Sequence, residues 1–459
     1  MVRAVIDMVR KAIQSPIPSG GGKGVGAEIL RLALPSIVTN ITVPLLGLID
    51  LAIVGHMGSD KYIATVAVGS MLFNVMYWLM GFLRMSTSGT TAQAFGQENT
   101  FASARLLRRS LLIALTLGLI FIACQWLLLA VGLAVMHPEV SIVHLVKVYF
   151  SVCIWGAPAV LMLYAFTGWF IGMQNTRITM VVSITQNLLN ILLSLFFVYV
   201  CRLQIKGVAL GTMLSQWGGC LLALWLLHKR YPSSFRLLFK REPVLFRLSR
   251  ILPSFDSRST VDVDIFLRTV CLVAVNLFFT AWGAREGNLL LAVNTLLMTY
   301  FLLFSYFLDG FAYAAEALCG RYYGADDKAN FRLVCASLMK WGGAMIVVFT
   351  LLYAVAGKPF LSLLTSETAV IHASQPYFPW VLLVPVCGMA AFIYDGIFVG
   401  ITASRGMLLA TLIATLAFFA LFFLLFPICG NHALWAALML YLALRGAIQW
   451  CILHQYLVN

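Results

Sequence analysis

The chain has 459 residues, of which 61% are hydrophobic and 10% are charged, and its mean hydropathy is +0.94. This composition excludes an ordinary soluble globular protein and indicates an integral membrane protein. The formal net charge of +14 would suit nucleic-acid binding, but the positions of the charges favour another explanation, given below. The ten cysteines are scattered, without a Cys-x-x-Cys pair or a histidine cluster, so we expect neither disulfides nor a zinc site.

Positions 1–28 precede the first long apolar segment. No apolar stretch of adequate length ends there at a small-residue cleavage site, so we expect no cleavable signal peptide. We predict that positions 1–28 form a cytoplasmic tail, with 15–26 as a flexible tether.

Apolar segments long enough to cross a bilayer recur along the rest of the chain, each needing about 20 residues as a helix. The strand-like alternation of an outer-membrane barrel is absent, so helices are the remaining way to span the membrane. We therefore predict an all-α membrane protein with twelve transmembrane helices. Their approximate ranges are 29–56, 62–83, 108–135, 143–172, 178–201, 207–228, 262–283, 288–319, 333–357, 377–402, 407–427 and 433–456.

The lysines and arginines predict the orientation, because positively charged loops remain cytoplasmic. With the N-terminus inside, 23 of the 31 Lys and Arg fall in inner segments, and six fall outside. Both termini are thus expected to be cytoplasmic. We expect anionic lipid headgroups beside the inner loops, and no nucleic acid.

Two sequence motifs recur at one separation, which we call the repeat length. TGWFIGMQNTR at 167–177 matches DGIFVGITASR at 395–405, which pairs Gly172 with Gly400. AFGQENTFASAR at 94–105 matches YYGADDKANFR at 322–332, which pairs Gly96 with Gly324 across the same separation. Both motifs fall in equivalent inner loops, so we expect two related halves.

The repeat predicts two six-helix lobes, at 29–228 and 259–459, related by a pseudo-two-fold axis normal to the membrane. The longest charged connector lies between them, and we predict that 229–258 forms a basic cytoplasmic linker.

Four segments carry a resemblance to a known family: LPSIVTNITVPLLGLIDLAIVGHMG, TTAQAFG, LDGFAYAAEALCGRYYGA and GNHALW. With the six-plus-six layout, they resemble the multidrug and toxic compound extrusion (MATE) family, and within it the DinF branch of bacterial DNA-damage-inducible membrane proteins. The resemblance implies secondary antiport across the bacterial inner membrane. Entry of protons or sodium would drive out amphipathic, often cationic, organic compounds by alternating access.

One acid lies within the first predicted span. Asp50 precedes Met57 by seven residues, which is roughly 10 Å of helix. A carboxylate at this depth normally faces the bundle interior or a wet cavity, although a hydrogen bond to a neighbouring helix is the alternative. Pro35 and Pro44 each remove a backbone donor and permit a kink. Lost solvation disfavours the charged carboxylate, and the resemblance implies that Asp50 is the proton-coupling acid.

The resemblance also marks polar positions in the N-lobe. Asn190 and Thr212 match polar family residues, whereas Ser194 stands where many proton-coupled relatives have a second Asp, so a two-acid relay cannot operate here. Asn187 lies three residues before Asn190 and shares its helix face. We expect the two amides to bind Asp50 or a substrate, with helix joining as the alternative.

The predicted C-lobe holds further embedded acids, namely Asp309, Glu316 and Asp395. Asp395 resembles an acid of the cation site in sodium-coupled members, but the second acid expected in helix 7 has no match. Structural ion pairs with Arg268 or Arg445 are the alternative, and substrate contact is a third. Asp264 is spaced to pair with Arg268 at i, i+4.

Other functions stay open as alternatives. One is a sodium-coupled exporter with a C-lobe cation site. Another is a lipid-linked oligosaccharide flippase of the same superfamily, which the scarcity of helix-embedded basic residues disfavours. An enzyme is disfavoured because no acid cluster or metal-ligand spacing is present. We therefore expect a monomer without cofactor, coupled to protons or alternatively sodium, whose partners are membrane lipids and small organic substrates.

Overall fold

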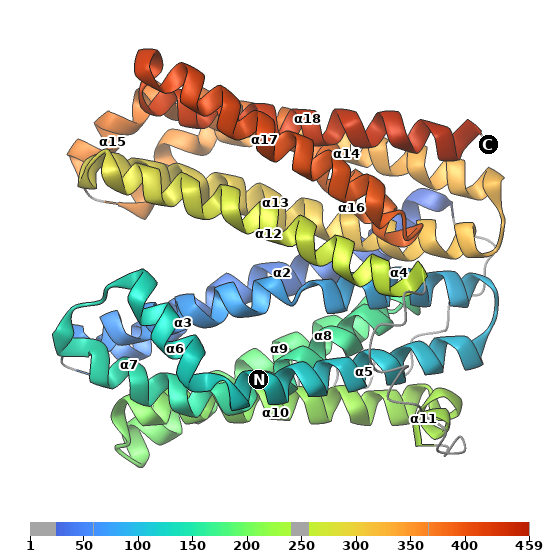
Figure 1. The fold of residues 1–459 in the computed structure, drawn as a ribbon, viewed down its shortest axis with the longest axis horizontal. Helices are drawn as coiled ribbons and strands as arrows, with labels where there is room; N and C mark the ends of the chain where they lie inside the picture. The colour runs from blue at the N-terminus through green and yellow to red at the C-terminus, as the bar shows by residue number, and fades with distance from the viewer. Residues whose placement is uncertain (1–23, 58, 240–256, 366, 459) are drawn as a thin grey trace. The chain divides into compact units, whose positions relative to one another are not determined.

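The computed structural model describes residues 24–57, 59–239, 257–365 and 367–458, and most of them are helical (Figure 1). None of these described residues lies in a strand. Most of the predicted tail, tether and linker lies outside the described residues. The last positions of the predicted tail and tether are helical instead, because α2 begins at Val25.

The first half of the chain contains these helices in order: α2 (Val25–Gly55), α3 (Asp60–Leu79), α4 (Phe82–Gly96), α5 (Thr100–Ala123), α6 (Gln125–Met136), α7 (Val140–Cys153), η1 (Ile154–Gly156), α8 (Ala157–Gly172), α9 (Thr176–Leu195), η2 (Phe196–Val200), α10 (Gln204–Arg230) and α11 (Pro232–Phe239). The second half contains α12 (Ser257–Arg285), α13 (Asn288–Gly324), α14 (Lys328–Leu364), α15 (Thr368–Ser374), η4 (Gln375–Tyr377), α16 (Phe378–Gly400), α17 (Ser404–Cys429) and α18 (Asn431–Val458).

Eleven helical segments of the described chain are long and apolar enough to cross a membrane. Helix α2, with 31 residues, adds another of spanning length. This confirms the predicted twelve-helix, all-α layout, in which each helix satisfies its own backbone groups within lipid. Two predicted ranges differ most from the structure. The second span extends to Gly96 through α3 and α4, whereas we predicted an end at 83. The third span runs from Thr100 to Ala123, and a turn at Cys124 separates it from α6.

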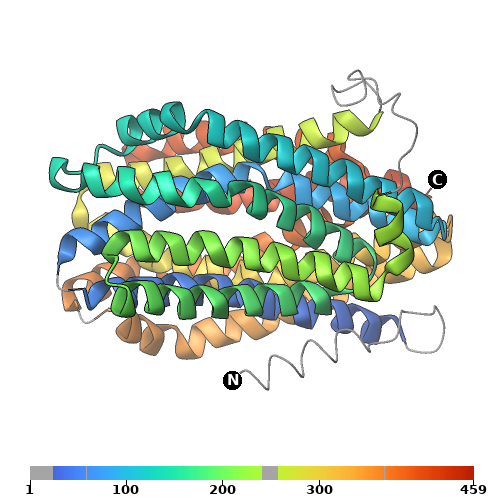
Figure 2. The same cartoon turned by 90° about the horizontal axis from the view of Figure 1, so that it is seen from below.

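Two compact units divide the described residues. One contains residues 38–239, and the other contains 24–37 together with 257–458. The first part of α2 packs within the second unit, whereas the rest of this helix belongs to the first. In the second unit, the Tyr322 hydroxyl donates to Glu28 at 3.3 Å. Within the first unit α9 and α10 run side by side (Figures 1 and 2), and α17 and α18 pack together within the second.

Helix starts reproduce the internal repeat. Helices begin at 60, 100, 140 and 176 in the first half, and at 288, 328, 368 and 404 in the second. Each pair of starts is separated by the repeat length that the sequence motifs define. The two halves therefore share one framework.

The turns before α5 and α14 repeat the same backbone conformation. Glu98 and Asp326 both have a left-handed φ of 55°. The next residues are both helix N-caps: Asn99 accepts from the Ala102 backbone N–H and Asp327 from that of Asn330. Such caps satisfy a backbone donor that the first helical turn leaves free.

Glycines in the repeated motif bring helices into close contact. A Cβ on Gly172 would lie 2.7 Å from the backbone oxygen of Ser88. A Cβ on Gly400 would lie 2.9 Å from the backbone oxygen of Glu316, which is itself the repeat equivalent of Ser88. Small residues let membrane helices approach this closely. The motif therefore produces the packing of α4 against α8 in the first half and the equivalent packing of α13 against α16 in the second.

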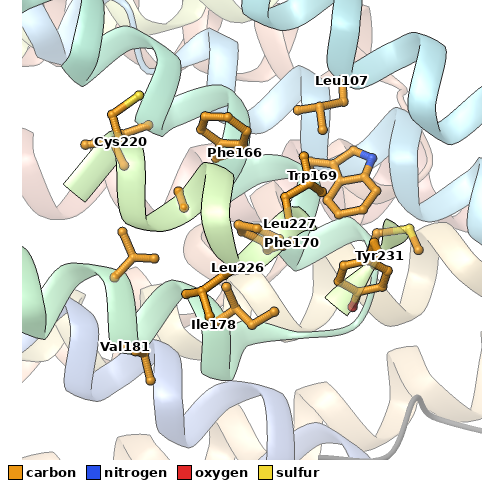
Figure 3. Packing of buried hydrophobic residues seen from close by; sticks show 14 of the residues in the cluster. Leu107, Phe166, Trp169, Phe170, Ile178, Val181, Cys220, Leu226, Leu227 and Tyr231 are labelled. Atoms are coloured by element: carbon orange, nitrogen blue, oxygen red, sulfur yellow. The ribbon is translucent and has the colours of Figure 1, made fainter. Parts of the chain in front are cut away.

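Near the start of α5 and the ends of α8 and α10, aromatic and aliphatic residues form a buried apolar core (Figure 3). Trp169 is fully buried, and its indole N–H donates to the backbone oxygen and the hydroxyl of Ser103 at 3.1 and 3.0 Å. Tyr231 packs edge-on against it and accepts a bond from Asn175 at 3.2 Å. This core anchors α11 against α5.

Candidate functional site

Asp50 lies on α2, five residues before the helix ends at Gly55. Its side chain is partly buried, and Oδ1 is buried without a hydrogen-bond partner in the described part of the chain. The next turn of the same helix contributes Ile53 and Val54 to an apolar cluster with α3, α7 and α10. A carboxylate oxygen is thus held against apolar packing in the first unit.

The electrostatic neighbours of Asp50 are on α7. Tyr149 and Cys153, one turn apart and both buried, interact with the Asp50 carboxylate. Tyr149 shares a side-chain hydrogen bond with Ser70 on α3, and its ring lies where a Cβ on Gly69 would collide with it. Tyr149 was not predicted as a site residue, because a tyrosine on an apolar helix carries no signal until packing brings it beside an acid.

Side-chain donors from α9 and η2 reach the backbone of α2. Asn187 donates to the Thr42 carbonyl at 3.3 Å, and the Tyr199 hydroxyl donates to the Ile53 carbonyl at 3.3 Å. These two attachments lie on either side of Asp50 along the helix. Both prolines of α2 lie within one unbroken helix, so the predicted kink is not a break in the helix.

The other predicted polar residues bind one another, and none makes a hydrogen bond to Asp50 within the described structure. Asn190 donates to the Thr212 hydroxyl at 3.2 Å, joining α9 to α10. Its Oδ1 and the hydroxyl of Ser194 are buried without partners among the described residues. Ser194 faces Gly211, where a Cβ would lie 2.5 Å from its hydroxyl oxygen. Asp50 and the Asn190–Thr212 pair are therefore not joined in one hydrogen-bonded network among the described residues.

The acid of α16 lies in an ionic cluster of the second unit. Asp395 forms ion pairs through Oδ2 with Arg268 and, at 3.5 Å, with Arg445. Its Oδ1 accepts a bond from Gln449 at 2.6 Å. All four side chains are buried.

This cluster corrects the expected Asp264–Arg268 pair, which does not form among the described residues. Asp264 accepts a bond from the Ser404 hydroxyl at 2.7 Å, at the start of α17. A partner on a distant helix thus prevails over the i, i+4 neighbour, because α16 brings Asp395 closer to the Arg268 guanidinium.

The remaining acids of the second unit lie on α13. Asp309 interacts electrostatically with Tyr306 and Arg445. Glu316 is fully buried, and its backbone oxygen packs against Gly400. In the described part of the chain, no group of three or more His, Cys, Asp or Glu side chains could hold a metal ion.

Comparison with known proteins identifies the fold and the relatives. The family model described as MatE matches residues 35–196 and 265–425. The chain is 35% identical over 426 residues to the DNA damage-inducible protein F of Escherichia coli K12, covering 91% of this chain and 89% of that protein. It is 23% identical to the probable multidrug resistance protein NorM of Thermotoga maritima, covering 76% of this chain and 74% of that protein.

Solved structures agree on the fold. A crystal structure of MATE in the bent conformation aligns with a TM-score of 0.82 at 17% identity, covering 99% of this chain and 97% of that chain. A mutant of the Vibrio cholerae MATE transporter VcmN also gives a TM-score of 0.82, at 14% identity, covering 94% of this chain and 97% of that chain. At such low identity these structures establish the architecture alone.

Proposed function

Since this chain is a multi-pass membrane protein of the MatE family, the multidrug and toxic compound extrusion transporters, we propose that it exports amphipathic organic cations in exchange for protons. The exchange proceeds by alternating access, and Asp50 is the group that binds the proton. The coupling ion is H⁺, and no cofactor takes part.

One observation supports this proposal above the others: Asp50 Oδ1 is buried and unpaired among the described residues. A buried charged oxygen without a partner carries an uncompensated desolvation cost. A proton on the carboxyl removes the charge, and a cationic ligand beside the carboxylate compensates it. One carboxyl cannot hold the proton and pair with the cationic ligand at the same time. This mutual exclusion is what an exchange of the two requires.

The groups around Asp50 can connect its protonation to the way in which α2 is held. Tyr149 and Cys153 lie close enough to Asp50 to interact electrostatically with its carboxylate. Asn187 and Tyr199 hold the backbone of α2 on both sides of the acid. In the proposal, protonation of Asp50 changes how α2 is held between these attachments, and the two prolines of α2 lower the cost of bending it.

The alternatives receive less support from the contacts. A sodium-coupled exporter would need the acid of α16, and Asp395 is already paired with Arg268 and Arg445. An oligosaccharide flippase would need free basic groups for a pyrophosphate, and these same two arginines are engaged with the acid. We further propose a non-enzymatic, monomeric transporter of the bacterial inner membrane with both termini cytoplasmic.

The test is efflux of a fluorescent organic cation from proteoliposomes under an imposed proton gradient and, separately, a sodium gradient. We expect proton-driven efflux by the wild type and its loss in Asp50→Asn. Asp60→Asn, which changes an exposed acid at the start of α3, is the matched control and should leave efflux unchanged. Efflux that survives Asp50→Asn, or that follows sodium alone, contradicts the proposal.

A further inference from the structure

The ionic cluster around Asp395 joins three helices of the second unit. Asp395 comes from α16, Arg268 from α12, and Arg445 and Gln449 from α18. The exposed fractions of Asp395, Arg268, Arg445 and Gln449 are 6%, 8%, 3% and 0%, respectively. A charge in such a place needs a partner, because burial without one is costly.

Both carboxylate oxygens of Asp395 are engaged. Oδ2 faces the Nη2 atoms of Arg268 and Arg445, and Oδ1 accepts the Gln449 amide. A hard cation such as Na⁺ needs several free oxygen ligands and a net negative surrounding. At Asp395, Na⁺ would have to displace one guanidinium group and remain beside the other. Two positive charges bound to the same carboxylate repel strongly in a low dielectric. The residues therefore do not fit the sodium site that the family resemblance implies at Asp395.

The two arginines are not equivalent. Arg445 also donates to the Tyr441 hydroxyl at 3.4 Å, lies 5.7 Å over the Phe392 ring and interacts with Asp309. Arg268 makes the closer ion pair with Asp395. Of the two, Arg268 is the arginine whose guanidinium is held chiefly by this carboxylate.

The internal repeat provides an independent observation. One repeat length before Arg268 and Asp395 stand Asn40 and Thr167. The positions equivalent to Arg445 and Gln449 are Trp217 and Leu221. The cluster is thus not part of the framework that the two halves share. Its charges are an addition to the second half, placed on helices whose counterparts pack without them.

From these contacts we infer that Arg268 is the resident cation of Asp395, occupying the position that a coupling cation would take and closing this carboxylate to sodium. The inference deepens the proposed function, on which it rests, because it assigns the ion selectivity of the exchange to a tethered guanidinium. Arg268 is a positioning residue that also ties α12 to α16.

The test measures thermal unfolding of the full-length protein in detergent, in NaCl and in KCl at equal ionic strength. The wild type should have the same melting temperature in both salts. Arg268→Ala should melt at a lower temperature, and added methylguanidinium, below denaturing concentrations, should restore part of the loss. The double variant Arg268→Ala/Asp395→Asn should gain nothing from methylguanidinium. Arg285→Ala, an exposed arginine at the end of the same helix, is the control and should not respond.

Two results would overturn the inference. One is a saturable stabilisation of the wild type by Na⁺ that Asp395→Asn abolishes. The other is a methylguanidinium response of Arg268→Ala no larger than that of Arg285→Ala. If Arg268→Ala does not fold, thermal unfolding of Arg268→Lys and of the wild type in the two salts is measured instead. No transport is measured, so a failure of proton-driven efflux refutes the proposed function without affecting this result.

Discussion

Replacing the repeated glycines by alanine tests whether close helix contact holds each half together. A Cβ on Gly172 would lie 2.6 Å from the Thr91 Cβ and 2.7 Å from the Ser88 backbone oxygen. A Cβ on Gly400 would lie 2.9 Å from the Glu316 backbone oxygen. Such close contacts with backbone cannot be relieved by a rotamer change, so the helices themselves must move apart.

The magnitude follows from two opposing effects. Overpacking of a filled core costs about 1–3 kcal/mol, whereas alanine gains about 1 kcal/mol over glycine within a helix. Gly343 on α14 is the matched control, because a Cβ there meets nothing within 4 Å. We expect Gly343→Ala to stabilise slightly, and Gly172→Ala and Gly400→Ala to be less stable than this control by about 1–3 kcal/mol.

Unfolding of the purified variants in detergent, by temperature or by added SDS, measures these differences. The two motif variants should be destabilised to a similar extent, since the same framework surrounds them. Motif variants as stable as Gly343→Ala would refute the claim that these glycines bring the helices together.

Three further changes probe separate features by the same unfolding assay. Asp395→Asn should destabilise by about 3–5 kcal/mol, because it leaves buried guanidinium groups without their partner; no change would mean that the ion pairs are irrelevant to stability. Trp169→Phe should cost about 1–3 kcal/mol, since it removes an indole N–H that makes two buried hydrogen bonds; an unaffected variant would exclude these bonds as anchors. Asp327→Ala should cost about 0.5–2 kcal/mol through loss of the N-cap. The backbone N–H and side chain of Asn330 lower the pKa of Asp327. The part of its stabilisation that depends on the carboxylate charge should therefore be full above the usual aspartate range and be lost as pH falls through the lowered value. Asn99→Ala, at the equivalent uncharged cap, should cost the same at every pH.

The repeated framework was readable from the sequence because it depends on local features. Gly172 and Gly400 mark close helix contacts at the ends of α8 and α16, and the repeat length that separates them recurs in helix starts and caps. Apolar length likewise predicts spanning helices, since lipid leaves few other ways to satisfy the backbone.

The contacts of the candidate site depend on packing and were less readable. Asp50 was identifiable as an acid in an apolar helix, but Tyr149 became visible only once α7 lay beside α2. Local spacing paired Arg268 with Asp264, whereas the fold pairs it with Asp395 from a helix far along the chain. Nothing in the sequence distinguishes such a partner from the nearer one.

The central claim, that one carboxyl exchanges a proton for an organic cation, is tested most directly by counting protons released on binding. Calorimetric titration of tetraphenylphosphonium into the purified protein, in buffers of different ionisation enthalpy, gives this count from the linkage between binding and protonation. We expect the wild type to release about one proton per bound cation and Asp50→Asn to release none. Binding without proton release by the wild type, or equal release by both proteins, would contradict it.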